Sequence, residues 1–258
     1  MTETIAHSWF MLGRHIRDLL RQPIWIGTML TTPMVWLLLY SQLFRRITDL
    51  PGFETDSYVQ FLMPGVVVMT AFFTGTWNGM SMINDLDRGI VERFLATPAR
   101  RSSLVLGHVA QSSVVASIEA VIVLGIGFLL GARIHAGGAG WLAILVTAAL
   151  LTACFAGLSN AIALLVRREA TMIALANFIA LPLMFLSAIL IAPELMPGWM
   201  QAAARFNPVH WAVVAAREAV ETETDWTSIG IHIGLLTAFS AVAAVFATWA
   251  FRAYRRTL

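Results

Sequence analysis

Long apolar runs alternate with short polar connections along almost the whole chain. The runs cover residues 24–44, 59–83, 104–131, 141–166, 171–192 and 229–251. About 20 apolar residues in a helix cross a hydrocarbon core of about 30 Å, so each run is long enough to span a bilayer. The pattern predicts an all-α polytopic membrane protein with six transmembrane helices, forming a single transmembrane domain over residues 1–258.

A different pattern precedes the first run, within residues 1–23. Its apolar positions recur at steps of three and four residues, as on one face of a helix: Ile5, Trp9, Leu12, Ile16 and Leu19. The arginines of this segment fall mostly at other positions, which suits a helix lying in the headgroup layer. We therefore predict an amphipathic interface helix before the first span. The alternative is a solvated extension of that span.

Composition supports the membrane prediction. The chain is 58% hydrophobic and 12% charged, with a mean hydropathy of +0.74, whereas a soluble domain is about 25% charged. The net charge of +2 comes from small basic groups between the apolar runs, so we interpret these groups as topology signals and expect no nucleic acid partner. The single cysteine, Cys154, lies inside an apolar run and excludes an intrachain disulfide.

Arginine is distributed unevenly between the connections. One side of the predicted spans has Arg14, Arg17, Arg21, Arg88, Arg93, Arg100, Arg101, Arg167, Arg168, Arg252, Arg255 and Arg256. The other side has Arg45, Arg46, Arg133, Arg205 and Arg217. Because cytoplasmic connections carry the excess of positive charge, both termini are predicted to lie in the cytoplasm. The arginine-rich usage without lysine suggests a bacterial source, so we expect a multi-pass protein of the bacterial cytoplasmic membrane.

The absence of lysine from the sequence limits the chemistry of the chain. A phosphate-binding Walker A loop needs a lysine to hold the β- and γ-phosphates, and Schiff-base chemistry needs one as well. We therefore expect no ATPase or other enzymatic site in this chain, and any energy from ATP would come from another chain. The histidines are scattered over different segments, so neither a metal site nor a catalytic group is predicted: His7, His15, His108, His135, His210 and His232.

The connection over residues 84–103 mixes charges of both signs with an apolar ridge. Ile90, Phe94 and Leu95 form the ridge, and Pro98 ends the short helix. The charged residues around it are Asp85, Asp87, Arg88, Glu92 and Arg93. A short helix of this kind, held between two spans, is suited to gripping a cytoplasmic partner. A merely solvated connection would account for the arginines but not for Phe94 and Leu95.

Two motifs carry a resemblance to a known family. The first runs through this connection into the next span: Arg88-Gly89-(x)2-Glu92-Arg93-(x)2-Ala96-Thr97-Pro98-x-Arg100-Arg101, then Leu104-(x)2-Gly107-His108. The second is Pro193-Glu194-Leu195-Met196-Pro197-Gly198-Trp199, followed by Asn207-Pro208. Taken together in span order, they resemble type-2 ABC exporter permeases, particularly the daunorubicin-resistance subgroup.

The resemblance implies a half-transporter. Two permease chains, identical or related, would form the membrane domain, and a dimer of separate ATPase subunits that bind ATP and Mg would dock below it. The coupling helix, seated in the ATPase, would use Asp85, Arg88, Gly89, Glu92, Arg93, Phe94, Pro98, Arg100 and Arg101. Residues 193–228 would form short re-entrant helices outside the membrane, marked by Pro197, Trp199, Asn207 and Pro208. No cofactor is expected in this chain itself.

One acidic residue, Glu119, falls near the middle of the third predicted span. A carboxylate at that depth costs about 2.5 to 3.5 kcal/mol, so its side chain should face the protein interior. Glu119 would either line the substrate path or pair across the bundle. The alternative is a protonated side chain that is hydrogen-bonded to a neighbouring span.

A glycine spacing, a proline and a histidine allow three further predictions. The spacing of Gly75 and Gly79 permits a close approach between helices. Pro182 would loosen or kink the fifth span. His210, beside Trp211, allows a pH-sensing hypothesis, although an interfacial histidine accounts for it as well.

The expected function follows from the resemblance. The chain would be the permease subunit of an ATP-driven exporter that moves a hydrophobic or amphipathic compound, such as a drug, an antibiotic or a lipid, out across the membrane. Export of a lipid-linked polysaccharide or glycolipid is an alternative with the same architecture. A proton-coupled secondary transporter is a further alternative, supported only by Glu119.

Overall fold

The computed structural model describes residues 31–44, 57–95, 102–191 and 193–255, and every regular element in these parts is a helix. Residues 31–43 are helical and include η1 (Trp36–Tyr40) and α3 (Ser41–Leu43). The long helices are α4 (Tyr58–Asp87), α6 (Ser102–Leu129), α7 (Gly137–Val166), α8 (Glu169–Phe185) and α11 (Trp226–Arg255). The short ones are α5 (Ile90–Leu95), η3 (Pro193–Leu195), α9 (Gly198–Ala204) and α10 (Pro208–Glu218).

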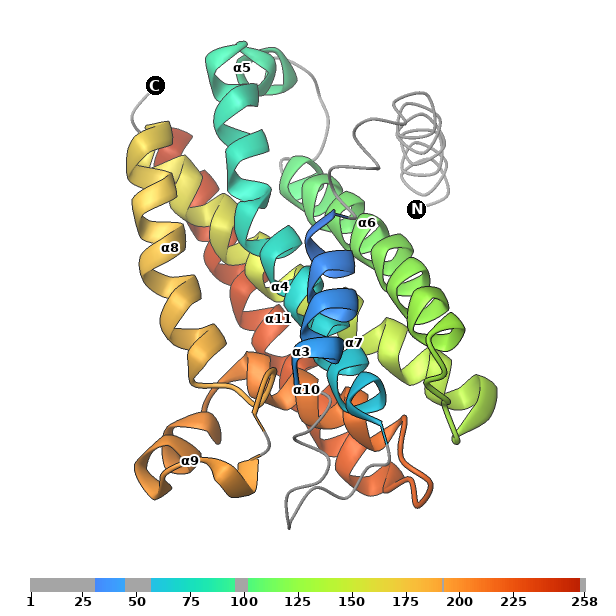
Figure 1. Cartoon of the computed structure of the whole chain (residues 1–258). Helices are drawn as coiled ribbons and strands as arrows, with labels where there is room; N and C mark the ends of the chain where they lie inside the picture. The colour runs from blue at the N-terminus through green and yellow to red at the C-terminus, as the bar shows by residue number, and fades with distance from the viewer. Residues whose placement is uncertain (1–30, 45–56, 96–101, 192, 256–258) are drawn as a thin grey trace.

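The long helices alternate in direction (Figure 1). α4 rises to α5 at one end of the bundle, which we call the α5 end, and α6 returns toward the other. α7, α8 and α11 continue the alternation, with α9 and α10 at the opposite end, which we call the α9 end. The short connections after α6 and after α7 make their neighbouring helices antiparallel.

Four of the described helices are long and apolar enough to cross a membrane: α4, α7, α11 and residues 105–129 of α6. α8 is an apolar helix of 17 residues. The first predicted span, 24–44, lies partly outside the described residues, and the interface helix predicted within 1–23 lies wholly outside them. The all-α fold is confirmed, whereas the count of six spans stays a prediction.

Two helices end at other residues than the apolar runs predicted. α4 continues to Asp87, so residues 84–87 belong to a long helix rather than to the connection. α8 ends at Phe185, although the predicted span runs to residue 192. The stretch after it remains apolar but turns back into the bundle, where Ala188 and Ile189 are fully buried. Hydropathy detects this burial but cannot distinguish it from a continuing helix.

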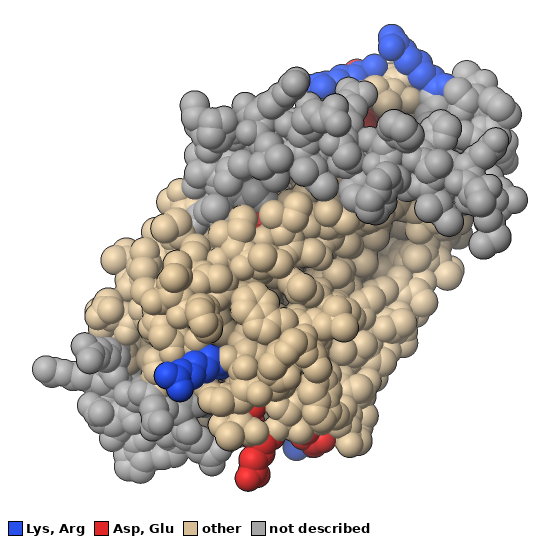
Figure 2. Space-filling model, turned by 90° about the vertical axis from the view of Figure 1, so that its right-hand side faces the viewer, with Lys and Arg blue, Asp and Glu red and all other residues tan. Residues whose placement is uncertain are grey.

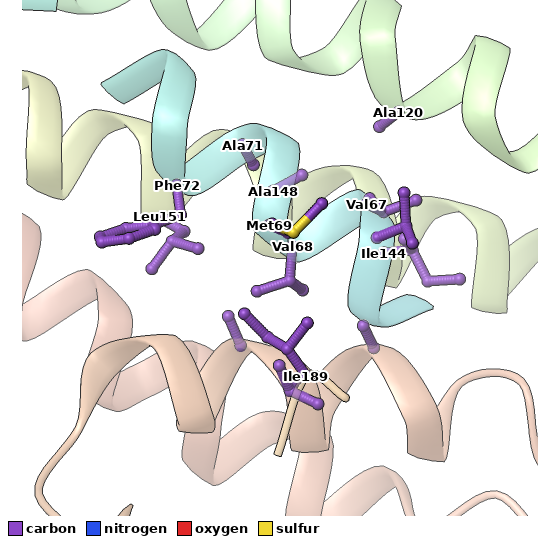
Figure 3. Close-up of a cluster of buried hydrophobic side chains, with 14 of the residues drawn as sticks. Val67, Val68, Met69, Ala71, Phe72, Ala120, Ile144, Ala148, Leu151 and Ile189 are labelled. Carbon is purple, nitrogen blue, oxygen red and sulfur yellow. The ribbon is translucent and has the colours of Figure 1, made fainter. Parts of the chain in front are cut away.

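The centre of the bundle is the contact between α4 and α7. Figure 3 shows Val68, Met69 and Phe72 of α4 in a cluster with Ile144 and Leu151 of α7. The ring of Phe72 meets that of Phe155 edge to face, with 4.6 Å between centroids. Such aromatic pairs add to the stability that burial already gives.

Small and hydroxyl-bearing residues bring α4 and α7 together. A Cβ on Gly75 would lie 2.7 Å from the Thr152 carbonyl oxygen, and one on Gly79 would lie 2.6 Å from that of Ser159. The Gly79 N–H donates to Ser159 Oγ at 2.8 Å, and Thr152 Oγ1 donates to the Ala71 carbonyl at 2.9 Å. The glycine spacing thus serves a close helix approach, as the sequence permitted.

Candidate functional site

A glycine turn sets the direction of α5. The backbone N–H of Arg88 donates to the carbonyl of Asn84 at 3.1 Å, and that of Gly89 donates to Leu86 at 3.0 Å, which closes the end of α4. Gly89 has φ of +65°, a left-handed conformation that side chains with a Cβ rarely adopt. The chain can therefore leave α4 and begin α5 at the next residue, which explains why a glycine occupies this place in the motif.

α5 presents a mixed surface at its end of the bundle. Val91 is fully buried, whereas Ile90 is 39% exposed and the side chains of Arg88 and Arg93 are exposed. One apolar and two cationic side chains are thus free to contact another molecule. Of the other residues predicted for coupling, Glu92 and Phe94 lie on α5, but their side chains are outside the described part of the structure. Pro98, Arg100 and Arg101 also lie outside it.

Charged side chains gather at the two ends of the molecule. In Figure 2 they appear at the upper and lower ends, and the described surface between is almost entirely uncharged. This is the distribution expected when the middle of the bundle faces hydrocarbon. Among the described residues, no three His, Cys, Asp or Glu side chains lie close enough to hold a metal ion.

Asp85 faces α6 rather than the outer surface. Its Oδ2 lies 3.0 Å from Nε2 of His108, and the two side chains are 24% and 13% exposed. Ser81 Oγ lies 3.5 Å from the other ring nitrogen of His108. The sequence predicted Asp85 as a coupling residue but not its partner, although His108 closes the first motif. The pair links the last turn of α4 to the second turn of α6.

Glu119 is buried at the same helix contact, deeper in the bundle. Glu119 is only 6% exposed, and Thr74 Oγ1 donates a hydrogen bond to Glu119 Oε2 at 2.7 Å. The structure therefore places Glu119 between α4 and α6, with a hydroxyl of the neighbouring helix as its partner. Thr74 was not singled out from the sequence, because a threonine in an apolar run gives no distinctive signal.

Asn207 connects the end of α8 to the start of α10, at the α9 end of the bundle. Its Oδ1 accepts from the backbone N–H of Val209 at 2.9 Å, which caps α10, and Pro208 occupies the first helical position. Its Nδ2 donates to the carbonyls of Leu183 at 2.7 Å and Leu186 at 2.9 Å, which end α8. The Asn-Pro step therefore has a structural role that the sequence did not reveal.

The other residues of the second motif lie on or beside α9. Pro197 precedes its first residue, and Trp199 is 68% exposed. An exposed tryptophan at one end of an apolar bundle is typical of a residue in a membrane–water interface. The motif thus divides into an internal anchor, Asn207, and a surface residue, Trp199.

His210 lies on α10, outside the long helices, and its Nδ1 is buried without a hydrogen-bond partner in the described structure. Burial, followed by the nearby charge of Arg217, lowers the pKa of His210 to about 4. The Arg217 guanidinium stacks over the Phe61 ring at 3.8 Å and donates to the Ile189 carbonyl at 3.2 Å. His210 is consequently neutral near pH 7.

The alternating apolar helices and the charged ends are those of a multi-pass membrane protein. Residues 7–220 match the family model of the ABC-2 type transporter, and the chain belongs to this family. The resemblance predicted from the two motifs is confirmed.

Named relatives agree with this assignment. The chain is 25% identical over 258 residues to the daunorubicin resistance ABC transporter permease protein DrrB1 of Streptomyces coeruleorubidus, covering 99% of this chain and 87% of the relative. It is 26% identical over 217 residues to the putative transport permease ycf38 of Cyanophora paradoxa, covering 83% and 73%. It is 24% identical over 228 residues to the inner membrane transport permease YadH of Escherichia coli strain K12, covering 84% and 85%. All three are named as permeases, consistent with a non-enzymatic membrane subunit.

Proposed function

We propose that this chain is the permease subunit of an ATP-driven exporter that moves a hydrophobic or amphipathic compound, such as a drug, an antibiotic or a lipid, outward across the cytoplasmic membrane. The observation that carries the proposal is α5, a short helix between two long ones that exposes Ile90 and Arg93 beyond the end of the bundle. An apolar side chain flanked by cations suits a protein partner better than it suits water.

The partner is an ATPase dimer in the cytoplasm, which binds the ATP and Mg that this chain has no lysine-bearing loop to hold. The distribution of arginines supports a cytoplasmic location for α5. The described arginines at the α5 end are Arg88, Arg93, Arg167, Arg168, Arg252 and Arg255, against Arg133, Arg205 and Arg217 at the α9 end. The excess of positive charge marks the cytoplasmic side, so the α5 end points toward the ATPase.

A second permease chain completes the pathway. On α4, Trp77, Ser81 and Asn84 are exposed in the single chain and follow one another at helical spacing. Polar side chains on a membrane helix rarely face lipid, so this stripe supports a route between two chains. Phe178 and Phe185 on α8 are 77% and 61% exposed, which suits contact with lipid or with the second chain.

At the outer face, α9 and α10 would dip toward the membrane without crossing it. α10 has 11 residues and would extend only about 16 Å, roughly half the thickness of a hydrocarbon core. Its buried residues pack into the bundle, among them Val209, Ala212 and Ala216. This packing supports a cap over the pathway at the α9 end.

The test reconstitutes the chain with the ATPase that co-purifies with it, in inside-out vesicles. Daunorubicin serves as the fluorescent probe, because one relative is named for resistance to it, and a labelled phospholipid tests the lipid arm. A variant with Ile90→Asp and Arg93→Glu should lose the bound ATPase and the uptake. Arg133→Glu, an exposed change at the α9 end, is the control and should retain both. Full transport with no ATPase present would refute the proposal.

The proton-coupled alternative depends on Glu119. If it were correct, Glu119→Gln would abolish uptake, and collapse of the proton gradient would do the same with ATP still present. The exporter proposal expects uptake that needs ATP and survives the loss of the gradient.

A further inference from the structure

α4 and α6 are tied to each other at two depths. Near the α5 end the tie is the Asp85–His108 pair at 3.0 Å, and deeper in the bundle it is the hydrogen bond from Thr74 to Glu119 at 2.7 Å. Thr74 and Asp85 are eleven positions apart along α4, which corresponds to roughly 16 Å of helix. Two polar ties that far apart resist both separation and twisting of the two helices.

The outer tie lies where α5 joins the bundle. α4 passes through Asp85 and ends at Asp87, and the turn at Gly89 begins α5. α6 starts at Ser102, and His108 follows in its second turn. The pair therefore closes the open side of the elbow formed by α4, α5 and α6.

A glycine turn alone transmits force poorly. Two turn hydrogen bonds join Arg88 and Gly89 to α4, and the final turn of a helix is where local opening costs least. α4 and α6 also pack directly against each other, for example where Met63 of α4 meets Gly127 of α6. At the α5 end the Asp85–His108 pair adds a polar link, and without that link a push on α5 would more readily bend the turn or spread the two helix ends. With the tie in place, the same push displaces both helices together.

We propose that Asp85 and His108 are positioning residues for coupling, whose pair keeps the elbow rigid so that movement of the ATPase reaches the spans. Asp85 acts inside the permease and not as a contact to the ATPase. This inference rests on the proposed function, since it assigns the pair a role in energy transfer. The hydrogen-bonded acid–imidazole geometry and partial burial of both groups make the tie stronger than an exposed surface pair.

The first experiment measures rigidity in the permease alone. Spin labels are placed at the exposed positions Arg93 on α5 and Ala110 on α6, in a Cys154→Ala background that removes the only native thiol. The distance distribution between the labels should broaden in Asp85→Ala and in His108→Ala. It should remain narrow in Asp87→Ala, the control, which removes an exposed carboxylate two residues away. An unchanged distribution in both pair variants would overturn the inference.

The second experiment measures substrate moved per ATP hydrolysed by the complex with its ATPase. Asp85→Ala and His108→Ala should each lower this ratio about fivefold or more while the ATPase stays bound, and the double variant should be no worse than either single one. A variant with Asp85→Cys and His108→Cys, joined by a bifunctional thiol reagent, should recover the ratio, which a failure to fold would not allow. Loss of the bound ATPase in Asp85→Ala, or no recovery on cross-linking, would overturn the inference.

The two readouts separate the two proposals. Suppose that the wild-type complex showed no ATP-dependent transport but the label distance distributions broadened as expected in the pair variants. The proposed function would then be wrong, and the Asp85–His108 pair would keep its role in holding α4, α5 and α6 rigid. If transport required ATP but the pair variants kept the normal ratio, the function would stand and the coupling role of the pair would fall.

Discussion

α7 and α8 are both apolar helices, but they relate to α4 in different ways. α7 packs among α4, α6 and α11, and glycines and hydroxyl groups bring its backbone into contact with that of α4. α8 buries only Met172, Ala176 and Ala180 and leaves Phe178 and Phe185 exposed. Hydrophobicity therefore does not distinguish a core helix from a surface helix in a membrane protein. The position of small residues does, because they determine how closely backbones approach.

The largest effect is expected from truncating the aromatic core of α4. Phe72→Ala should lower the free energy of unfolding by about 3 to 5 kcal/mol, because the side chain is fully buried and its cavity cannot refill. Phe178→Ala on α8 is the matched control, and its effect should lie within about 0.5 kcal/mol. Denaturant titration in detergent measures both. Equal losses would mean that α8 is as deeply packed as α4.

Enlarging the glycine contact should destabilise the fold by about 3 kcal/mol. Gly79→Leu would force atoms against the Ser159 carbonyl and push α4 away from α7. Gly125→Leu on α6 is the control, since a Cβ there meets no other heavy atom within 4 Å. Thermal unfolding of the purified chain compares the two. A similar shift for both would exclude close α4–α7 contact as the cause.

Removing the link between the end of α8 and α10 should lower the free energy of unfolding by about 2 kcal/mol. Asn207→Ala removes the cap of α10 and leaves the carbonyls of Leu183, in α8, and Leu186, just after it, without the amide donor. Asn177→Ala, an exposed asparagine within α8, should change stability very little. Hydrogen exchange should also rise at the end of α8 in the first variant. Protection that stayed unchanged there would argue against the anchor.

The smallest effect concerns pH and α10. The folded state lowers the pKa of His210 from 6.5 to about 4. Between these values the unfolded chain therefore binds a proton that the folded chain does not. Stability should consequently fall as pH decreases from 6.5 toward 4, and it should be constant above 6.5 as far as this group is concerned. The midpoint of thermal unfolding at pH 7.5 and at pH 5 measures the loss, which His210→Gln should reduce. An equal loss in the variant would assign it to other groups.

Sequence patterns predict the parts of the fold that depend on local composition. The run that became α7 is apolar, long and bounded by glycine and arginine, and the structure has one uninterrupted helix there. The end of α8 is different, because it depends on Asn207, 24 residues away along the chain from Leu183. Hydropathy is averaged over residues that are adjacent in sequence, so it cannot predict a hydrogen bond between residues this far apart.

The candidate site divides in the same way. The turn at Gly89 and the exposure of Arg93 follow from local motif and charge. The burial of Glu119 follows from the cost of a carboxylate in hydrocarbon. Its partner Thr74 and the partner of Asp85 could not be predicted, because each pair joins two helices whose rotation about their own axes the sequence leaves undetermined.

The carboxamide of Asn207 satisfies one donor and two acceptors of the main chain at once. Aspartate has the same shape, but its oxygens can only accept when it is ionised, so it would repel the two carbonyls that it faced. Glutamine has the right chemistry on a stem one methylene longer, which would displace α10 from α8. Asparagine alone has both the hydrogen-bonding groups and the side-chain length that position 207 requires.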